Sequence, residues 1–142
     1  MEREMSVELP ANYKPSDKEK YMNEKQLEYF RQKLLDWKKS LLEESTETLG
    51  HLKEENWNEA DLADRATVET DTGLELRTRD RYRKLINKIE AAISRIDEGE
   101  FGYCEVTGEE IGLKRLEARP IATMTVQAQE EHERQEKMAE AS

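Results

Sequence analysis

The chain has 142 residues, of which 35% are hydrophobic and 39% are charged, and its formal net charge is −10. So small an apolar share excludes an ordinary compact globule and favours long helices that share a thin apolar seam. The negative charge disfavours direct binding to DNA, because sequence-independent DNA affinity comes from Lys and Arg that neutralise phosphates. A protein partner is therefore the first expectation.

Two further absences in the sequence bear on the compartment. No apolar stretch approaches the roughly 18 residues that a membrane span needs, and residues 1–16 lack the apolar segment of a signal peptide. The single cysteine, Cys104, cannot form an intrachain disulfide. We therefore expect a cytoplasmic protein that has no membrane anchor.

The first long helix is predicted from an apolar repeat. Residues 1–16 contain Pro10 and Pro15 and no period, so an irregular N-terminus is expected there. Ser16 is then a candidate helix cap, with Glu19 three places on as in a capping box. Beyond it, apolar residues recur at alternating spacings of three and four, which is the seam of a heptad repeat. They are Leu27, Phe30, Leu34, Trp37 and Leu41.

A second helix follows a polar connection. The register of the first helix puts Glu44 and Thr48 in the seam, so the packing should weaken towards Gly50, and residues 53–64 are mostly polar. The second seam consists of Tyr82, Leu85, Ile89, Ala92 and Ile96. This helix should stop at Gly99, a residue type favoured just after a helix. Because so short a link joins the two helices, we expect them to run antiparallel. At a rise of 1.5 Å per residue, the hairpin would be about 45 to 50 Å long.

The fold class predicted is mainly α. Residues 1–16 are irregular, and residues 17–99 form a long antiparallel two-helix coiled-coil hairpin with its tip near 54–66. Residues 100–126 form a small globular knuckle, where an aromatic, a cysteine and several glycines are closely spaced. Residues 127–142 form a charged C-terminal helix.

Five sequence blocks stand out along the chain. They are Asp61-Leu-Ala-Asp-Arg-Ala66, Leu74 to Arg81, Lys84 to Glu90, Phe101-Gly-Tyr-Cys104 and Arg115 to Pro120. In this order, they resemble the DksA/TraR family. The resemblance implies a bacterial transcription factor that binds RNA polymerase rather than DNA. It implies that the hairpin enters the secondary channel of the polymerase and brings its acidic tip near the catalytic centre. There, with guanosine tetraphosphate, it would destabilise open complexes at stable-RNA promoters and favour initiation at others.

The sequence departs from that family at its zinc finger, which usually has two Cys-x-x-Cys pairs. The corresponding positions here are Cys104 with Thr107, and Thr125 with Ala128. Thr and Ala cannot supply a thiolate, and adding His132 still falls short of the four ligands of structural zinc. We expect a zinc-finger-like shape without a metal, held by apolar packing. The packing residues expected are Phe101, Tyr103, Ile111, Leu113, Leu116, Ile121 and Met124.

Asp61, Asp64 and Ala66 are the candidate tip residues. From the residues alone, the two carboxylates are helix caps, because Asp is a favoured N-cap and is stabilised by the helix dipole. The resemblance adds a second role, in which Asp64 orders the turn, Asp61 projects and Ala66 keeps a small surface against the polymerase. No nucleophile, histidine or metal cluster accompanies the carboxylates, so no enzymatic activity is expected.

The second helix has a line of cations along one face, which we call the basic stripe. Its members are Arg77, Arg81, Lys84 and Lys88. One interpretation is a solvated stripe whose charge is neutralised by Glu75, Asp80 and Glu90. The other is an anion site, because Arg and Lys bind pyrophosphates such as those of guanosine tetraphosphate.

The resemblance places that nucleotide between the protein and the polymerase. Its contacts map onto Leu85, Lys88 and Arg119. Gln129 stands where family members carry a Lys, which removes one positive charge. Nucleotide binding would then be weaker, or completed by Arg115 or Lys137.

Three functional classes remain open. The first is a zinc-independent polymerase regulator that acts as a monomer. The second is a Gre-like factor whose tip carboxylates hold a magnesium ion in the polymerase and stimulate transcript cleavage. The third is a hairpin adaptor without polymerase contact. Cys104 is likewise either a redox switch or a buried remnant, since the chain has no resolving cysteine.

Overall fold

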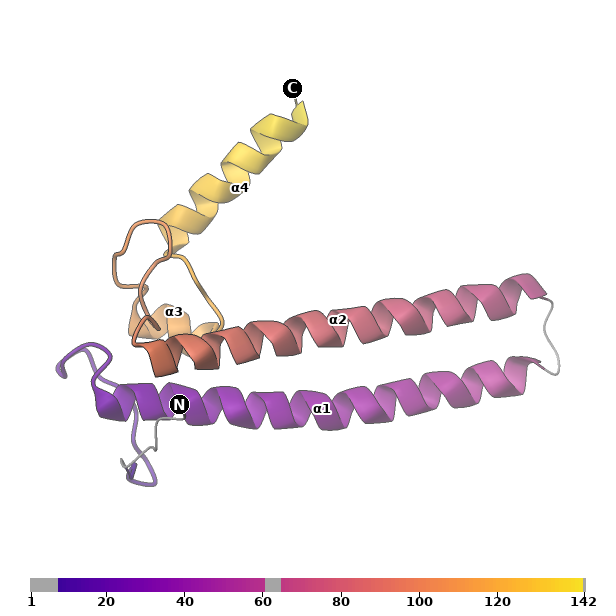
Figure 1. Cartoon of the computed structure of the whole chain (residues 1–142), viewed down its shortest axis with the longest axis horizontal. Coiled ribbons are helices and arrows are strands. Elements are labelled where there is room, and N and C mark those ends of the chain that lie inside the picture. Colours follow the sequence, from indigo (N-terminus) through magenta and orange to yellow (C-terminus); the bar gives the residue numbers. More distant parts are fainter. Residues whose placement is uncertain (1–7, 61–64, 142) are drawn as a thin grey trace. The chain divides into compact units, whose positions relative to one another are not determined.

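The computed structural model describes the backbone of residues 8–60 and 65–141, and the side chains of residues 8–54 and 73–141. Its helices are α1 (Glu24–Ala60), α2 (Arg65–Glu98), α3 (Leu113–Ala118) and α4 (Val126–Ala141), as Figure 1 shows. Over these ranges no β-strand is formed, and a single antiparallel bridge joins Tyr103 and Glu110. The protein is therefore mainly α, as predicted.

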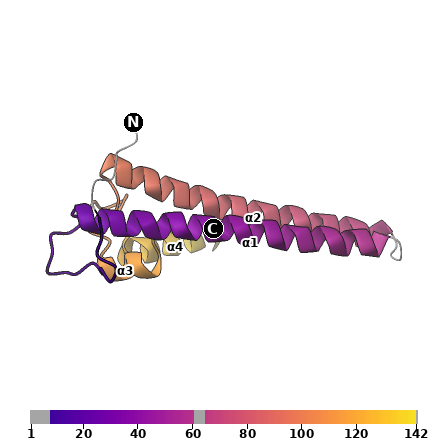
Figure 2. The same ribbon diagram turned by 90° about the horizontal axis from the view of Figure 1, so that it is seen from below.

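The chain divides into two compact units. The hairpin unit is Leu35–Glu90, and the base unit combines Met1–Leu34 with Ala91–Ser142. Both long helices contribute to both units. In the hairpin unit, α1 and α2 lie side by side and run antiparallel in both views (Figures 1 and 2). The long helix pair expected from the two heptad patterns is thereby confirmed.

The helices of the hairpin unit meet along a narrow seam. Leu41 of α1 is 6% exposed and Ile89 of α2 is fully buried, as their heptad positions predict. Beside the seam, Lys38 Nζ lies 3.1 Å from Glu90 Oε1 and links the two helices. Tyr82, which is 8% exposed, brings a hydroxyl into the same seam. The seam is therefore apolar at Leu41 and Ile89 and contains a polar group at Tyr82.

The first helix begins at Glu24, so the predicted cap at Ser16 is wrong. A short turn follows Ser16 instead. The cap is formed by Asn23, whose Oδ1 accepts the N–H of Gln26 at 2.8 Å, while Gln26 Oε1 accepts the N–H of Met22 at 2.8 Å. Met22 has a φ of 52°. A helix that continued from Ser16 could not pass through this left-handed conformation.

The second helix ends at Glu98 and is followed by Gly99, as predicted. This glycine has a φ of 79°, and its N–H donates to the carbonyl of Ile96 at 3.2 Å. The N–H of Glu100 donates to the carbonyl of Arg95 at 2.9 Å. Together these two bonds form a Schellman motif, which satisfies carbonyls left free at the helix end. The chain thereby leaves the helix and enters the knuckle.

The core of the base unit joins α1 and α2 to the knuckle. Its buried apolar residues are Phe30, Leu34, Ala92, Ile96, Phe101, Cys104, Ile111, Leu116 and Ala122. The rings of Phe30 and Phe101 have centroids 5.5 Å apart. Leu116 belongs to α3, a short helix that was not predicted because so few residues show no clear period. Tyr103 was expected in this core but is 40% exposed.

Candidate functional site

The predicted tip lies largely outside the described residues. Asp61 and Asp64 fall in the undescribed segment, which joins Ala60 at the end of α1 to Arg65 at the start of α2. Ala66 belongs to α2, but its side chain is also outside the described part. The roles of these three residues therefore stay predictions.

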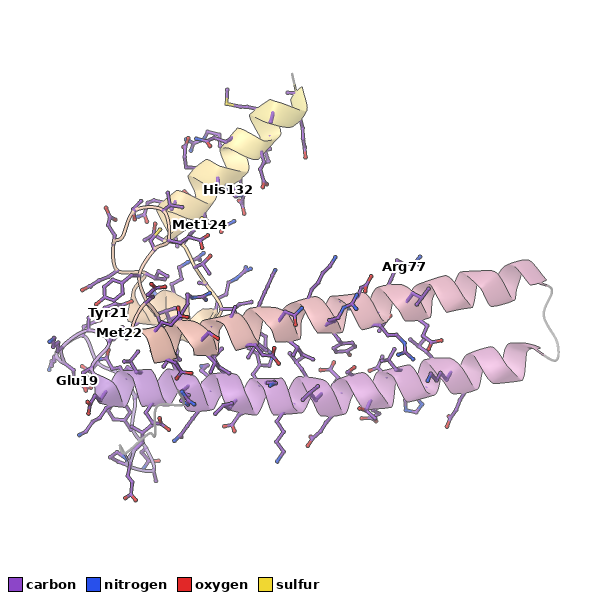
Figure 3. All side chains as sticks on the ribbon, in the orientation of Figure 1. Glu19, Tyr21, Met22, Arg77, Met124 and His132 are labelled. Atoms are coloured by element: carbon purple, nitrogen blue, oxygen red, sulfur yellow. The ribbon has the colours of Figure 1, made fainter. Side chains whose placement is uncertain are left out.

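The carboxylates expected to neutralise the basic stripe pair with other cations. The observed pairs are Glu75–Arg79, Asp80–Arg83 and Glu90–Lys38, at 2.9, 2.5 and 3.1 Å. Stripe members Arg77, Arg81, Lys84 and Lys88 are all exposed, and none forms an ion pair with a side chain that the structure describes. Figure 3 shows Arg77 on α2. A row of cations without paired carboxylates is suited to an anionic ligand.

The nucleotide contacts implied by the resemblance lie in both units. Leu85 is half-buried and Lys88 is exposed, and these residues of the hairpin unit are neighbours on one side of α2. Arg119 is exposed and belongs to the base unit, where it follows the last turn of α3. Its N–H donates to the carbonyl of Arg115 at 2.7 Å, which fixes the backbone at this point.

Arg119 also lines a cleft of about 660 Å³ in the base unit. The charged residues that line it are Glu109, Glu110, Lys114, Arg115 and Arg119. Arg115 is held in place because its Nε donates to the carbonyl of Met124 at 2.9 Å. The first turn of α4, at Val126, forms another wall, and the N-terminus of a helix has a positive partial charge. The cleft is therefore able to hold an anion beside two arginines.

Gln129 does not line that cleft. Its side chain is half-buried, and its Nε2 donates to Glu133 Oε1 at 3.1 Å. Of the two cations considered as substitutes for the missing Lys, Arg115 lines the cleft and Lys137 does not. His132, labelled in Figure 3, lies on exposed α4 and is 2.9 Å from the carboxylate four residues further on.

Hydrogen bonds between protein groups occupy the positions of the family's zinc ligands. Cys104 is 3% exposed and Thr125 is 6% exposed, and Thr125 Oγ1 accepts the N–H of Ala128 at 3.1 Å. Burial alone raises the pKa of the Cys104 thiol, but hydrogen bonds from the Thr107 side chain and nearby backbone N–H groups lower it to about 7. In the described part of the chain, no three His, Cys, Asp or Glu side chains are grouped for a metal. These residues do not fit a structural zinc ion.

Sequence reasoning missed Tyr21, because it lay in a segment predicted to be helix. The Tyr21 hydroxyl donates to the carbonyl of Gly102 at 2.7 Å and accepts the N–H of Gly112 at 3.0 Å. Next to it, Met22 covers Gly102 so closely that a Cβ there would lie 2.8 Å from Met22 Cγ. Figure 3 labels Tyr21 and Met22. The spacing of Gly102 and Gly112 was visible in the sequence, but nothing in the sequence indicated that Tyr21 bonds to both. Tyr21 thus joins the two ends of the knuckle loop.

Comparison with known proteins identifies related sequences over nearly the whole chain. Residues 26–96 match the family described as DnaK suppressor protein DksA, N-terminal domain, and residues 99–134 match the prokaryotic dksA/traR C4-type zinc finger. A Caulobacter vibrioides protein named RNA polymerase-binding transcription factor DksA is 62% identical over 128 residues, 90% of each chain. The Escherichia coli protein of that name is 47% identical over 117 residues, which are 82% of this chain and 76% of the other.

A solved structure shares the fold as well. Transcription factor DksA2 from Pseudomonas aeruginosa superposes with a TM-score of 0.74 and is 38% identical, covering 82% of this chain and 90% of that one. Among the described residues, no helix is both long and apolar enough to cross a membrane. The matched segments include the helix pair and the knuckle. The chain therefore belongs to the DksA family of transcription factors.

Proposed function

We propose that the protein regulates transcription by binding RNA polymerase and inserting its hairpin, as a coiled coil, into the secondary channel. The observation that supports this most is the 62% identity, over 90% of both chains, to a protein named for RNA polymerase binding. Asp61, Asp64 and Ala66 would then act near the catalytic centre. The protein would work in the cytoplasm as a monomer, without catalysis of its own and without direct DNA contact, in agreement with its net charge of −10.

Guanosine tetraphosphate is the proposed co-regulator at stringent-response promoters. Support comes from the exposed basic stripe, whose expected carboxylate partners pair with other cations. Leu85, Lys88 and Arg119 would contact the nucleotide. Arg115, which lines the same cleft as Arg119, would supply the positive charge that Gln129 lacks. The effect on promoters would be to change the stability of open complexes.

The proposed mechanism does not involve zinc. One buried thiol, with Thr and Ala at the other three positions, is too few ligands for structural zinc. We therefore expect purified protein to contain far less than one zinc per chain and to keep its promoter activity after treatment with a strong zinc chelator. Metal analysis that finds one zinc per folded chain, with loss of activity on chelation, would overturn this part.

The main experiment combines binding and promoter assays. Core RNA polymerase should retain the protein in a pull-down, and the protein should shorten the lifetime of open complexes at a ribosomal promoter, more so with guanosine tetraphosphate. Asp64→Asn and Ala66→Thr should still bind but inhibit less. Asp36→Asn, which changes an exposed carboxylate elsewhere in the hairpin unit, is the matched control. A wild-type protein that neither binds nor inhibits would refute the proposal.

A third assay separates the proposal from a Gre-like cleavage factor. Backtracked elongation complexes would be incubated with the protein, and the 3′ fragments released from the RNA would be measured. We expect no stimulation, because the chain belongs to the DksA family. Strong cleavage that depends on Asp61 and Asp64 would favour the Gre-like alternative.

A further inference from the structure

A buried tyrosine connects the two helices of the hairpin unit through polar side chains. Tyr82 of α2 is 8% exposed, and its hydroxyl lies 3.2 Å from Glu44 Oε1 and 3.3 Å from Thr48 Oγ1, both on α1. A carboxylate can only accept, so the Tyr82 hydroxyl donates to Glu44 and accepts the hydrogen of the Thr48 hydroxyl. We call these three residues the Tyr82 clasp.

The clasp lies where the apolar seam gives way to polar residues. After Leu41, the seam positions of α1 are Glu44 and Thr48, and α2 buries Thr78 as well as Tyr82. Leucines alone define the register of two helices poorly, because a seam that slides by one heptad meets apolar residues again. A buried polar group defines it well, since its partners are found at one position.

A slipped register would leave the tyrosine without its partners. A slip of one heptad that moves Tyr82 towards the start of α1 would bring it opposite Trp37 and Leu41. Neither side chain has an oxygen that could accept the hydroxyl hydrogen. Tyr82 is only 8% exposed, so a hydroxyl that loses its acceptor there has little water to bond to instead, which is unfavourable. The clasp therefore disfavours this alternative register.

We infer that Tyr82 is a positioning residue, which fixes the register of the hairpin through Glu44 and Thr48 and so sets how effective the bound protein is at RNA polymerase. The register determines which residues of α1 and α2 stand opposite one another on the way to Asp61 and Asp64. Only the effect on polymerase rests on the proposed function. The effect on register is a property of the isolated protein.

The register is measured by the distance between two spin labels. Ser40 of α1 and Asn87 of α2 are exposed and would carry the labels on introduced cysteines, while Cys104 is buried. Wild type should give one narrow distance distribution. In Tyr82→Phe a second distance should appear, because the loss of one net hydrogen bond shifts the ratio of the two registers about fivefold. Tyr103→Phe is the matched control, because Tyr103 is 40% exposed and its side chain forms no hydrogen bond in the described part.

Changes on α1 test whether Tyr82 acts through its partners. Glu44→Gln keeps an acceptor oxygen and should keep the single distance, whereas Glu44→Leu should add the second one. Thr48→Val keeps the shape and removes one hydroxyl, so it should have a smaller effect than Tyr82→Phe. Circular dichroism checks that each variant is still helical. If Tyr82→Phe and Glu44→Leu both keep one narrow distance distribution, the inference is overturned.

The promoter assay tests the consequence for function. For Tyr82→Phe, the protein concentration that gives half-maximal inhibition should stay within about twofold of wild type, while the maximal inhibition should fall. A loss of affinity with full maximal inhibition, or a second distance with unchanged inhibition, would refute the positioning role. If wild type does not bind the polymerase at all, the proposed function fails, and the distance measurement still decides the register.

Discussion

At Cys104, burial and hydrogen bonding act on the thiol in opposite directions, and the hydrogen bonds prevail. They lower its pKa from 9.0 to about 7, so the folded knuckle favours the thiolate. Between these two values, the unfolded chain binds more protons than the folded one. This contribution to stability is therefore complete above about pH 9 and is lost as the pH falls through about 7.

The first prediction is a pH dependence that belongs to this one residue. Urea unfolding at several pH values between about 6 and 9 should show wild type gaining stability relative to Cys104→Ser as the pH rises. Serine does not titrate in this range, so the difference between the two proteins isolates the thiol. A difference that stays constant, or that shrinks at high pH, would contradict the assignment of a thiolate to the folded knuckle.

The second prediction concerns the tyrosine that joins the ends of the knuckle loop. Tyr21→Phe removes the hydroxyl that bonds to Gly102 and Gly112 and leaves a carbonyl and an N–H without that partner. The free energy of unfolding should fall by about 1 to 3 kcal/mol. Tyr103→Phe should change it little, because that side chain is 40% exposed. Urea unfolding curves measure both, and equal losses would show that Tyr21 has no special role.

At the scale of the elements, two glycines with open surroundings should respond in opposite directions. A Cβ would meet nothing within 4 Å at either Gly50 or Gly99. Gly50 lies inside α1, so Gly50→Ala should stabilise the protein by roughly 0.5 to 1 kcal/mol. Gly99 has a φ of 79°, so Gly99→Ala should destabilise it by roughly 1 to 2 kcal/mol. Thermal unfolding of both variants checks the signs.

The elements also show what the sequence could predict. The 3-4 spacing of apolar residues gave both long helices, and Gly99 gave the end of α2, because each is a local pattern with one physical cause. The start of α1 was missed, because the positive φ of Met22 has no signal in the local sequence, and Met22 packs against Gly102, which is far along the chain. The short helix α3 was missed because its burial depends on the whole base unit rather than on a period.

The sequence predicted that the members of the basic stripe share one face of α2. It did not predict which cations the neighbouring carboxylates pair with. Glu75 was considered as a partner for the stripe, yet it pairs with Arg79, which is four residues away on the same helix. The preference of ion pairs for this spacing was available from the sequence and predicts the Glu75–Arg79 pair. Leu85 and Lys88 belong to the hairpin unit and Arg119 to the base unit, so the pattern of a single helix could not predict a shared role for them.

For the whole molecule, the balance of charge leads to the last prediction. The chain has a net charge of −10, so an anionic nucleotide is repelled unless cations without carboxylate partners gather in one place. Lys88→Ala should therefore raise the concentration of guanosine tetraphosphate needed for promoter inhibition about tenfold, without reducing the pull-down by core polymerase. Arg83→Ala is the matched control, because Arg83 lies on the same helix but pairs with Asp80. Equal effects of both variants would mean that overall charge, rather than the basic stripe, governs the response.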